Sequence, residues 1–280
     1  MNLDMVLNTL DITGQAGRTL TTEESIVLYN SLLILQNENH FTKVYFWGKI
    51  FGTVKDYYIA YGYVKDALSD RSFYYSRDCT NWGLMPLPTE EGKLLTPLCT
   101  TMFEGDPALI VDIRIEEGEE LSGTVITKPQ VRKLKEENRL AATVHFLNHE
   151  AVVIPRGALF KRPDGVVVEN RTFEGLSELE SREIKAFLHY RLPTQKWNTN
   201  LLTRDDYNFA IDFMDPCDID IPEGCFIHHL VAGDILVMIK PMYWPGMINF
   251  HYLQSPKYGF VYFGNGKRCI DVPFLLLPNL

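Results

Sequence analysis

The chain has 280 residues, of which 46% are hydrophobic, so it is long enough and apolar enough to bury a sizeable core. Its formal net charge of −9 and its isoelectric point near 5.3 argue against binding to nucleic acid, whose phosphates require clustered lysine and arginine. The same balance disfavours an anionic membrane surface. We therefore expect a folded protein with neither nucleic acid nor a membrane as its partner.

Cysteine usage and the first residues indicate the reducing cytoplasm. The five cysteines are odd in number, scattered and never spaced as a CxxC pair, which predicts reduced thiols and neither a disulfide framework nor a zinc knuckle. The opening stretch MNLDMVLNTLD has Asp4 where a secretory signal would carry basic residues. The longest apolar segment, residues 230–244, is interrupted by Asp234 and Lys240 and is shorter than the ~20 apolar residues of a membrane span. We expect a soluble intracellular chain.

Two helices are predicted near the start of the chain. A short amphipathic helix can form up to Leu10. A longer helix begins at Thr21, because Thr21 and Glu24 have the S/T-x-x-E spacing of a capping box, which satisfies free backbone N–H groups. It should end near residues 37–39. Its expected buried side consists of Ile26, Tyr29, Leu32, Leu33 and Leu35.

From Lys43 the apolar pattern changes to a period of two, which predicts strands at 44–51 and 57–63 and a third at 73–75. Aromatic side chains occur on both faces of the first two strands. An exposed antiparallel sheet normally has one polar face. We therefore expect this sheet to be covered on both sides, by helices of the chain or by another subunit.

The remainder of the chain mixes short helices and strands. A helix is predicted from Val131 to about Asn148, and a second capping box at Ser177-Glu178-Leu179-Glu180 predicts a helix that buries Leu179, Ile184, Phe187 and Leu188. The acidic run at 116–120 is typical of a solvated turn. Strands are predicted at 151–154, 166–168, 226–231, 235–239 and 248–252.

The last predicted element is a hairpin. Large apolar side chains occupy both faces of the stretch 258–263, and Gly264-Asn265-Gly266 predicts a tight turn into a strand at 267–272. The following residues 274–277 are too apolar to be left in water, so this end completes a core or offers a surface to a partner. Together the pattern predicts an α+β fold, a mainly antiparallel sheet or sheets with about four helices packed around them, in one domain spanning 1–280.

One set of residues suggests chemistry. His145 and His149 are four apart on a predicted helix, so both imidazoles share a face, as a metal pair requires. Five carboxylates gather in one later loop, and together with the histidines they give the hypothesis of a metal-dependent hydrolase. Against it, no third ligand accompanies the histidines, and Pro216 and Pro222 favour an irregular loop of solvated carboxylates. These carboxylates are Asp212, Asp215, Asp218, Asp220 and Glu223.

Several blocks of the sequence closely resemble the radial spoke head protein 9 family, whose members are components of the spoke heads in motile cilia and flagella. The blocks follow the order of the family and cover the chain nearly from end to end, except for residues 106–150. They are YFWGKIFG at 45–52, DYYIAYG at 56–62, VVIPRGALF at 152–160, NRTFEGLS at 170–177, YWPG at 243–246 and YGFVYFGNG at 258–266 with the ending DVPFLLLPNL.

The resemblance implies a non-catalytic structural subunit of the axonemal radial spoke head, without a cofactor. The spoke head projects toward the central pair of microtubules and helps to regulate the dyneins that bend the cilium. The implied partners are the spoke head proteins 4 and 6, the spoke backbone protein 3 and, directly or indirectly, the central pair apparatus. The implied location is the cytoplasm and cytoskeleton, in the axoneme of the cilium or flagellum.

Amphipathic aromatic residues are the candidates for contacts with these partners, because they bury a large area and keep a polar group. Filling the chain's own core is the alternative role for each of them. A third hypothesis is a peptide-binding module that accepts a strand at a sheet edge. The interface candidates are Trp47, Tyr57, Tyr58, Tyr61, Arg156, Trp244, Tyr258, Phe260 and Tyr262.

Overall fold

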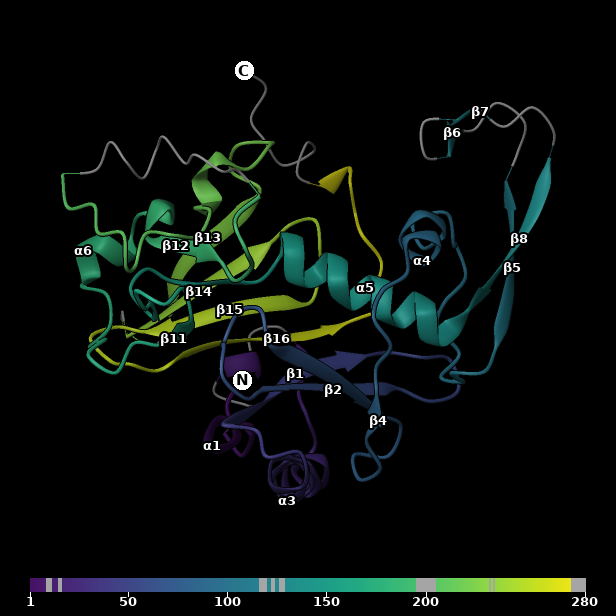
Figure 1. Cartoon of the computed structure of the whole chain (residues 1–280), viewed down its shortest axis with the longest axis horizontal. Coiled ribbons are helices and arrows are strands. Elements are labelled where there is room, and N and C mark those ends of the chain that lie inside the picture. Colours follow the sequence, from purple (N-terminus) through teal and green to yellow (C-terminus); the bar gives the residue numbers. More distant parts are fainter. Residues whose placement is uncertain are drawn as a thin grey trace.

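The protein is described by a computed structural model over residues 1–8, 12–14, 17–115, 120–121, 124–125, 129–194, 205–231, 233 and 235–272 (Figure 1). At its centre is an eight-stranded sheet with the order β13-β14-β15-β16-β1-β2-β3-β4. Strands from the two ends of the chain meet inside this sheet, where β16 (Tyr258–Gly264) pairs in parallel with β1 (Lys43–Ile50). The other pairings described for this sheet are antiparallel, so the predicted α+β class is confirmed.

Apart from the closing strand at 267–272, the predicted strands are confirmed to within two residues at each end. The central sheet also contains β2 (Tyr57–Tyr63), β3 (Arg71–Ser76), β4 (Gly83–Leu84), β13 (Phe226–Val231), β14 (Leu236–Pro241) and β15 (Met247–Tyr252). Within the described residues, four two-stranded sheets accompany it. They pair β5 (Ile110–Ile115) with β8 (Gln130–Lys135), β6 (Glu120–Leu121) with β7 (Thr124–Val125), β9 (Val153–Pro155) with β12 (Phe187–His189) and β10 (Leu159–Lys161) with β11 (Val167–Glu169).

Helices of the chain itself cover both faces of the central sheet, as Figure 1 shows. Five α-helices are described: α1 (Leu3–Val6), α3 (Thr22–Glu38), α4 (Glu90–Leu95), α5 (Glu136–Glu150) and α6 (Glu178–Ser181). Short 3-10 turns, η2 (Ile184–Ala186) and η3 (Cys217–Ile219), flank β12 and the carboxylate-rich loop. One apolar cluster joins α1 and α3 to one face, and another joins α5 to the opposite face. The expectation of a sheet covered on both sides is therefore confirmed.

Strand β1 distributes its aromatic residues between the two clusters. Phe46 belongs to the cluster beside α3, whereas Trp47 belongs to the cluster beside α5. The pairing register with β2 shifts between Phe46 and Gly48, which marks a β-bulge. Gly48 has a φ of +152°, and a Cβ there would lie 2.3 Å from the carbonyl oxygen of Tyr262. Only glycine therefore permits the close parallel pairing of β1 with β16.

The first long helix begins as predicted, and two of its expected buried residues, Leu32 and Leu35, are buried. In α3, Glu24 N donates to Thr21 Oγ1 at 3.1 Å and Thr21 N donates to Glu24 Oε2 at 2.7 Å, so the capping box is confirmed. Ile26, expected to be buried, is 51% exposed. The helix packs through Leu28, Leu32 and Leu35, together with two serines on the same side.

Two other predicted helices are shorter than expected. Residues 130–135 form β8, which pairs with β5, and the helix begins only at Glu136. The second capping box is confirmed, but α6 ends at Ser181 and Leu179 is 80% exposed. Phe187 and Leu188 are buried, as expected, but on β12 and not on a helix. Both segments form strands because they pair with the distant strands β5 and β9. The local sequence pattern does not reveal this pairing.

The predicted closing hairpin is wrong. Strand β16 ends at Gly264, and residues 265–271 contain no strand. Both edges of β16 are already occupied, one by β15 and the other by β1, so no edge is left for a hairpin partner. The chain instead crosses toward the helices, where Lys267 Nζ donates to the carbonyl of Thr100 at 2.8 Å. The apolar residues 274–277 lie outside the described residues.

Candidate functional site

Most of the predicted interface residues lie inside the protein. Six of them join one core cluster beside α5: Trp47, Tyr57, Tyr61, Trp244, Phe260 and Tyr262. Tyr58 is buried in the cluster beside α3, and Tyr258 is half-buried against the first cluster. These side chains therefore fill this chain's own core. A contact with a partner stays a prediction for them, and burial leaves little of their surface for it.

The polar groups of these aromatic residues also have partners inside the chain. Trp47 Nε1 donates to Asn148 Oδ1 and Trp244 Nε1 to Glu150 Oε2, both at 2.8 Å. Burial raises the pKa of Tyr61 and Tyr258 well above the ordinary value, because a buried phenolate would lose its solvation. The phenols therefore remain neutral near pH 7.

Glu136 connects the aromatic core to the loop before β5, and the sequence patterns did not single it out. It is fully buried at the start of α5 and accepts a hydrogen bond from the Tyr57 hydroxyl at 2.7 Å. The backbone N–H groups of residues 104, 105 and 106 donate to the same carboxylate at 2.8–3.0 Å. Its position in the first turn of a helix was the available signal, since acidic residues are favoured there.

The carboxylate-rich loop is not a solvated loop in its first half, which corrects the prediction. Asp212 and Asp215 are buried, at 4% and 2% exposure. Arg156 binds Asp212 through two nitrogens, with Nε–Oδ1 at 2.6 Å and Nη2–Oδ2 at 2.8 Å, and its Nη1 lies 2.6 Å from Asp206 Oδ2. The hydrogen bond to Asp212 raises the pKa of Arg156 above its ordinary value. This predicted interface residue therefore holds the loop against β9.

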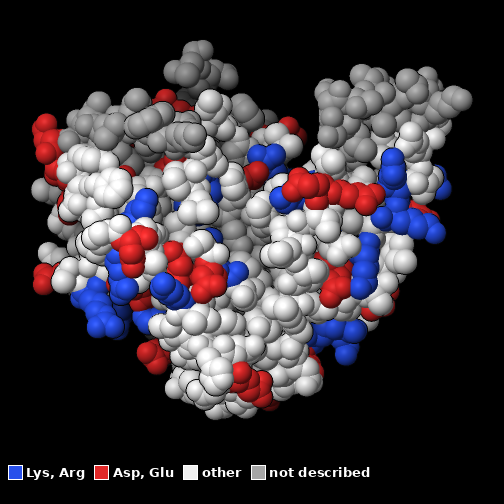
Figure 2. All heavy atoms as spheres, in the orientation of Figure 1, with Lys and Arg blue, Asp and Glu red and all other residues white. Residues whose placement is uncertain are grey.

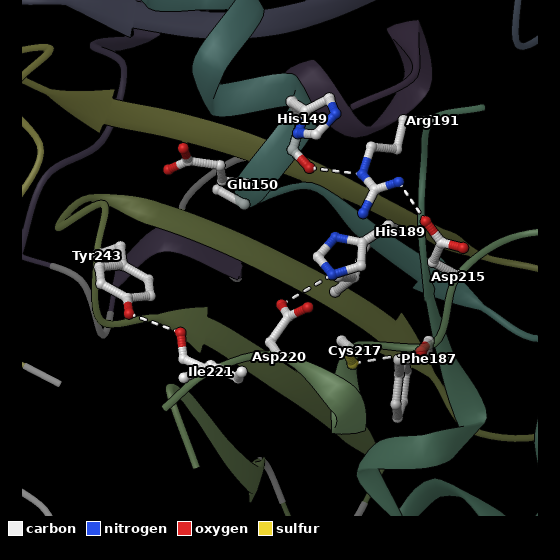
Figure 3. A network of polar contacts seen from close by, with 12 residues as sticks. His149, Glu150, Phe187, His189, Arg191, Asp215, Cys217, Asp220, Ile221 and Tyr243 are labelled. Atoms are coloured by element: carbon white, nitrogen blue, oxygen red, sulfur yellow. Dashed lines mark hydrogen bonds and ion pairs between the residues drawn. The ribbon is translucent and has the colours of Figure 1, made fainter. Parts of the chain in front are cut away.

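Asp215 is bound in a similar way from the other side (Figure 3). Arg191 Nη1 forms an ion pair with Asp215 Oδ2, and Arg191 Nε donates to the carbonyl of His149 at 2.9 Å. The N–H and hydroxyl of Thr194 donate to the same aspartate oxygen at 2.9 and 3.0 Å. Arg191 thus connects the end of α5 to the loop.

His189 completes this polar network on β12. Its Nε2 lies 2.8 Å from Asp220 Oδ2 (Figure 3), and its backbone N–H donates to the carbonyl of Asp215. Burial raises the pKa of the Cys217 thiol well above the ordinary value, so it is not a reactive thiolate. Within the described residues, His189 Nδ1, Asp215 Oδ1 and Asp218 Oδ1 have no hydrogen-bond partner.

The predicted histidine pair lies on α5, with the ring centroids of His145 and His149 6.2 Å apart. Burial lowers the pKa of both, that of His149 to about 4. Among the residues that the structure describes, no group of three or more histidine, cysteine or acidic side chains could hold a metal ion. The arginines already occupy Asp212 and Asp215. The two ion pairs therefore stabilise the loop.

The face drawn in Figure 2 shows no broad field of one charge sign. On the face in Figure 2 acidic and basic side chains are mixed, with uncharged areas between them. Large apolar side chains are exposed at the end of β4 and in the proline-containing loop after it, where Leu84 is 63% and Leu87 is 87% exposed, respectively. In the described part of the chain, no helix has the length and hydropathy that a membrane crossing requires.

The chain is similar over its whole length to radial spoke head proteins. It is 36% identical to the Homo sapiens protein named radial spoke head protein 9 homolog, over 280 residues that cover 99% of this chain and 100% of that protein. The Danio rerio protein of the same name is 37% identical over 281 residues, with the same coverage, and the Mus musculus protein is 35% identical. The family model described as Radial spokehead-like protein matches residues 1–96. The chain therefore belongs to the radial spoke head protein 9 family.

Proposed function

We propose that this protein is a non-catalytic structural subunit of the radial spoke head in the axoneme of motile cilia and flagella. It helps to assemble the head that faces the central pair and regulates dynein-driven motility. The observation that carries this proposal is the 36% identity to a radial spoke head protein 9 homolog across 99% of the chain. Similarity over the whole length means that each element of the fold has a counterpart in the relative.

The chemistry of the polar side chains supports a structural role. The buried aspartates that could act as acids or metal ligands are bound by Arg156 and Arg191. The tyrosines of the core have raised pKa values and donate hydrogen bonds within the chain. Groups used in this way stabilise a fold and are not available for proton transfer to a substrate.

The proposed partners are the spoke head proteins 4 and 6, the spoke backbone protein 3 and, directly or through these, the central pair apparatus. The proposed location is the ciliary axoneme, within the cytoplasmic cytoskeleton. We further propose that residues 1–280 act as one domain, since strands from both ends of the chain share the central sheet. Among the interface candidates, Tyr258 and Arg156 retain some exposed surface for a partner.

Affinity purification tests the assembly. The tagged chain is expressed in ciliated cells, axonemes are extracted with detergent, and the proteins that accompany it are identified by mass spectrometry. Co-recovery of the spoke head proteins 4 and 6 is expected. A matched control carries Leu32→Asp, which places a charge in the core beside α3 and should abolish co-recovery by unfolding the chain. Recovery of the folded chain apart from all spoke proteins would contradict the proposal.

Elemental analysis tests the absence of catalysis by a metal. The purified chain should contain no stoichiometric zinc, manganese or calcium. A stoichiometric metal that is lost in a variant with His145→Ala and His149→Ala would favour the hydrolase hypothesis instead.

A further inference from the structure

In the part of the chain that the structure describes, Arg139 on α5 is a buried cation that forms no ion pair with a carboxylate. The residue is only 2% exposed. Nη2 donates to the carbonyl of Thr101 at 2.7 Å, and the guanidinium lies 4.1 Å from the ring centroid of Phe103. Within the described residues, Nε and Nη1 have no hydrogen-bond partner. Three further N–H groups of a charged side chain therefore lack the acceptor that burial demands.

The nearest carboxylates of the chain are both occupied. Glu136 accepts from Tyr57 and from three backbone N–H groups. Glu150 pairs with Arg268 Nε at 2.9 Å and accepts from Trp244 Nε1. Arginine stays protonated at physiological pH, and among the described residues Arg139 forms no direct ion pair, although the charge of Glu136 acts on it from nearby. A buried charge without a paired group is costly, which indicates a place for an anion.

A second arginine, Arg71, has more of its nitrogen atoms hydrogen-bonded within the chain than Arg139 has. Arg71 also has one nitrogen without a partner, but two others donate to the carbonyls of Leu68 and Tyr190, and the residue is only half-buried. Arg139 has one such bond and is more deeply buried. The shortage of acceptors is therefore greater at Arg139.

Arg139 lines a pocket of about 320 Å³ between the segment after α4 and the segment that follows β16. Two more cations, the exposed Lys267 and Arg268, lie at this pocket, and the carboxylate of Glu150, which pairs with Arg268, also lines it. Its apolar lining includes Phe146, Trp244 and the half-exposed Ile270. This volume is in the range of small-ligand sites, and such sites combine apolar walls with a few polar groups that fix orientation.

We propose that this pocket binds a carboxylate carried on an apolar group, with the carboxylate oxygens received by the Arg139 guanidinium. A planar guanidinium matches a carboxylate through two parallel hydrogen bonds along one edge, so the second N–H of Nη2 together with either Nε or Nη1 would donate to the two carboxylate oxygens. Lys267 attracts the anion to the opening, since Arg268 is already paired with Glu150, and the apolar walls cover the group that carries the carboxylate. The carboxylate belongs to an acidic side chain of a partner polypeptide or to a small carboxylic acid. This inference goes beyond the proposed function and does not depend on it.

Binding of hexanoate to the full-length chain tests the pocket. Isothermal titration and thermal unfolding should show saturable binding with a Kd of about 1 mM, as expected for so small a ligand. Hexanol, which has the same apolar chain and no charge, should bind at least about tenfold more weakly. Equal effects of hexanoate and hexanol would overturn the proposal, as would the absence of any hexanoate binding.

Variants locate the binding within the molecule. Arg139→Met keeps the apolar volume and should abolish hexanoate binding, and Arg139→Lys should weaken it about tenfold because an ammonium cannot form the two parallel bonds. The matched control is Arg71→Met, which changes an arginine outside this pocket and should leave binding unchanged. Ile270→Glu alters only the exposed rim, so it should fold normally and weaken binding by repulsion. Undiminished binding in folded Arg139→Met or Ile270→Glu would contradict the proposal.

The source of the carboxylate is found in the assembled complex. Carbodiimide treatment of purified axonemes joins Lys267 to a carboxylate in contact with it, and peptide mapping then identifies an acidic residue of a partner. A small acid is instead recovered by native mass spectrometry of the released chain. The hexanoate comparison decides whether the pocket binds carboxylates, and it uses the isolated chain. Its failure is therefore distinct from failure of the chain to join the spoke head.

Discussion

The protein treats its buried arginines in two different ways. Around the carboxylate-rich loop, Arg156 and Arg191 each bind a buried aspartate. On α5, Arg139 is buried more deeply, and among the described residues it contacts one carbonyl and an aromatic ring but pairs with no carboxylate. The first region has its counter-charges within the chain. The second lacks them, although exposed cations stand beside it.

The arginines that are paired with aspartates stabilise the fold, whereas the unpaired Arg139 is available to bind an anion. Removing one partner of a buried ion pair leaves an uncompensated charge and is strongly destabilising. Removing a charge that never had a partner avoids that cost. Substitutions at the two regions should therefore have very different effects on the free energy of unfolding, although the residue type is the same.

The largest effect is expected for Asp212→Ala. This change leaves the Arg156 guanidinium, whose side chain is 10% exposed, with only the exposed Asp206 as a partner. It should lower the free energy of unfolding by about 3 kcal/mol, measured by urea denaturation. The matched control is Glu178→Ala, since the Arg182–Glu178 pair is exposed on both sides and should change stability by less than about 0.5 kcal/mol. Equal losses in the two variants would contradict the contrast between buried and exposed pairs.

His251 is a third kind of buried ionisable group, because burial keeps it in its neutral form. Leu176 N donates to His251 Nε2 at 3.0 Å, and burial lowers the pKa of His251 from 6.5 to about 4. The unfolded chain therefore binds the proton more readily between these values. The contribution of His251 to the free energy of unfolding is therefore fully present above pH 6.5. It is lost as the pH drops toward 4, and the loss amounts to up to about 3 kcal/mol.

Urea denaturation between pH 7 and pH 4.5 measures this dependence. In His251→Gln, which cannot take up a proton, the decrease in stability over this range should be smaller than in the original chain. His40→Gln, a change at an exposed histidine, should keep the original dependence. An unchanged slope in His251→Gln would show that other groups account for the acid sensitivity.

A smaller effect is expected at the buried carboxylate of α5. Glu136→Gln retains the shape of the side chain but replaces one acceptor oxygen by an N–H donor, which then faces backbone N–H groups. The free energy of unfolding should fall by about 2 kcal/mol. Glu137→Gln, at the neighbouring half-buried position, should cost less than half as much. An unchanged free energy of unfolding in Glu136→Gln would mean that water accepts the hydrogen bonds of the loop N–H groups instead.

The smallest effect on stability is expected for Arg139→Met in the free chain. It removes one hydrogen bond and a cation–π contact but also an unpaired buried charge, so the change should be within about 1 kcal/mol of zero. Thermal and urea unfolding measure it. A loss as large as that of Asp212→Ala would mean that Arg139 supports the fold as Arg156 does.

Local patterns in the sequence predicted much of the fold. The Thr21–Glu24 capping box identified the start of α3, and the two-residue period predicted β1 and β2. The aromatic residues on both strand faces predicted a sheet covered on both sides. These features depend on neighbouring residues, so a single sequence contains them.

Features that depend on distant pairing could not be predicted in this way. The closing hairpin was wrong because β16 already has β15 and β1 as neighbours, and the pairing with β1 joins the two ends of the chain. The burial of Asp212 and Asp215 depends on Arg156 and Arg191, which precede them by many residues. Arg139 gave no signal, because its sequence neighbours are those of an ordinary charged helix.

The parallel pairing of β16 with β1 has a consequence for synthesis. Strand β1 is translated well before its partner β16, so one edge of β1 remains open until β16 has been made. Non-local pairings of this kind slow folding, and an open aromatic edge favours aggregation. We therefore expect the nascent chain to depend on chaperones until residues 258–264 are available.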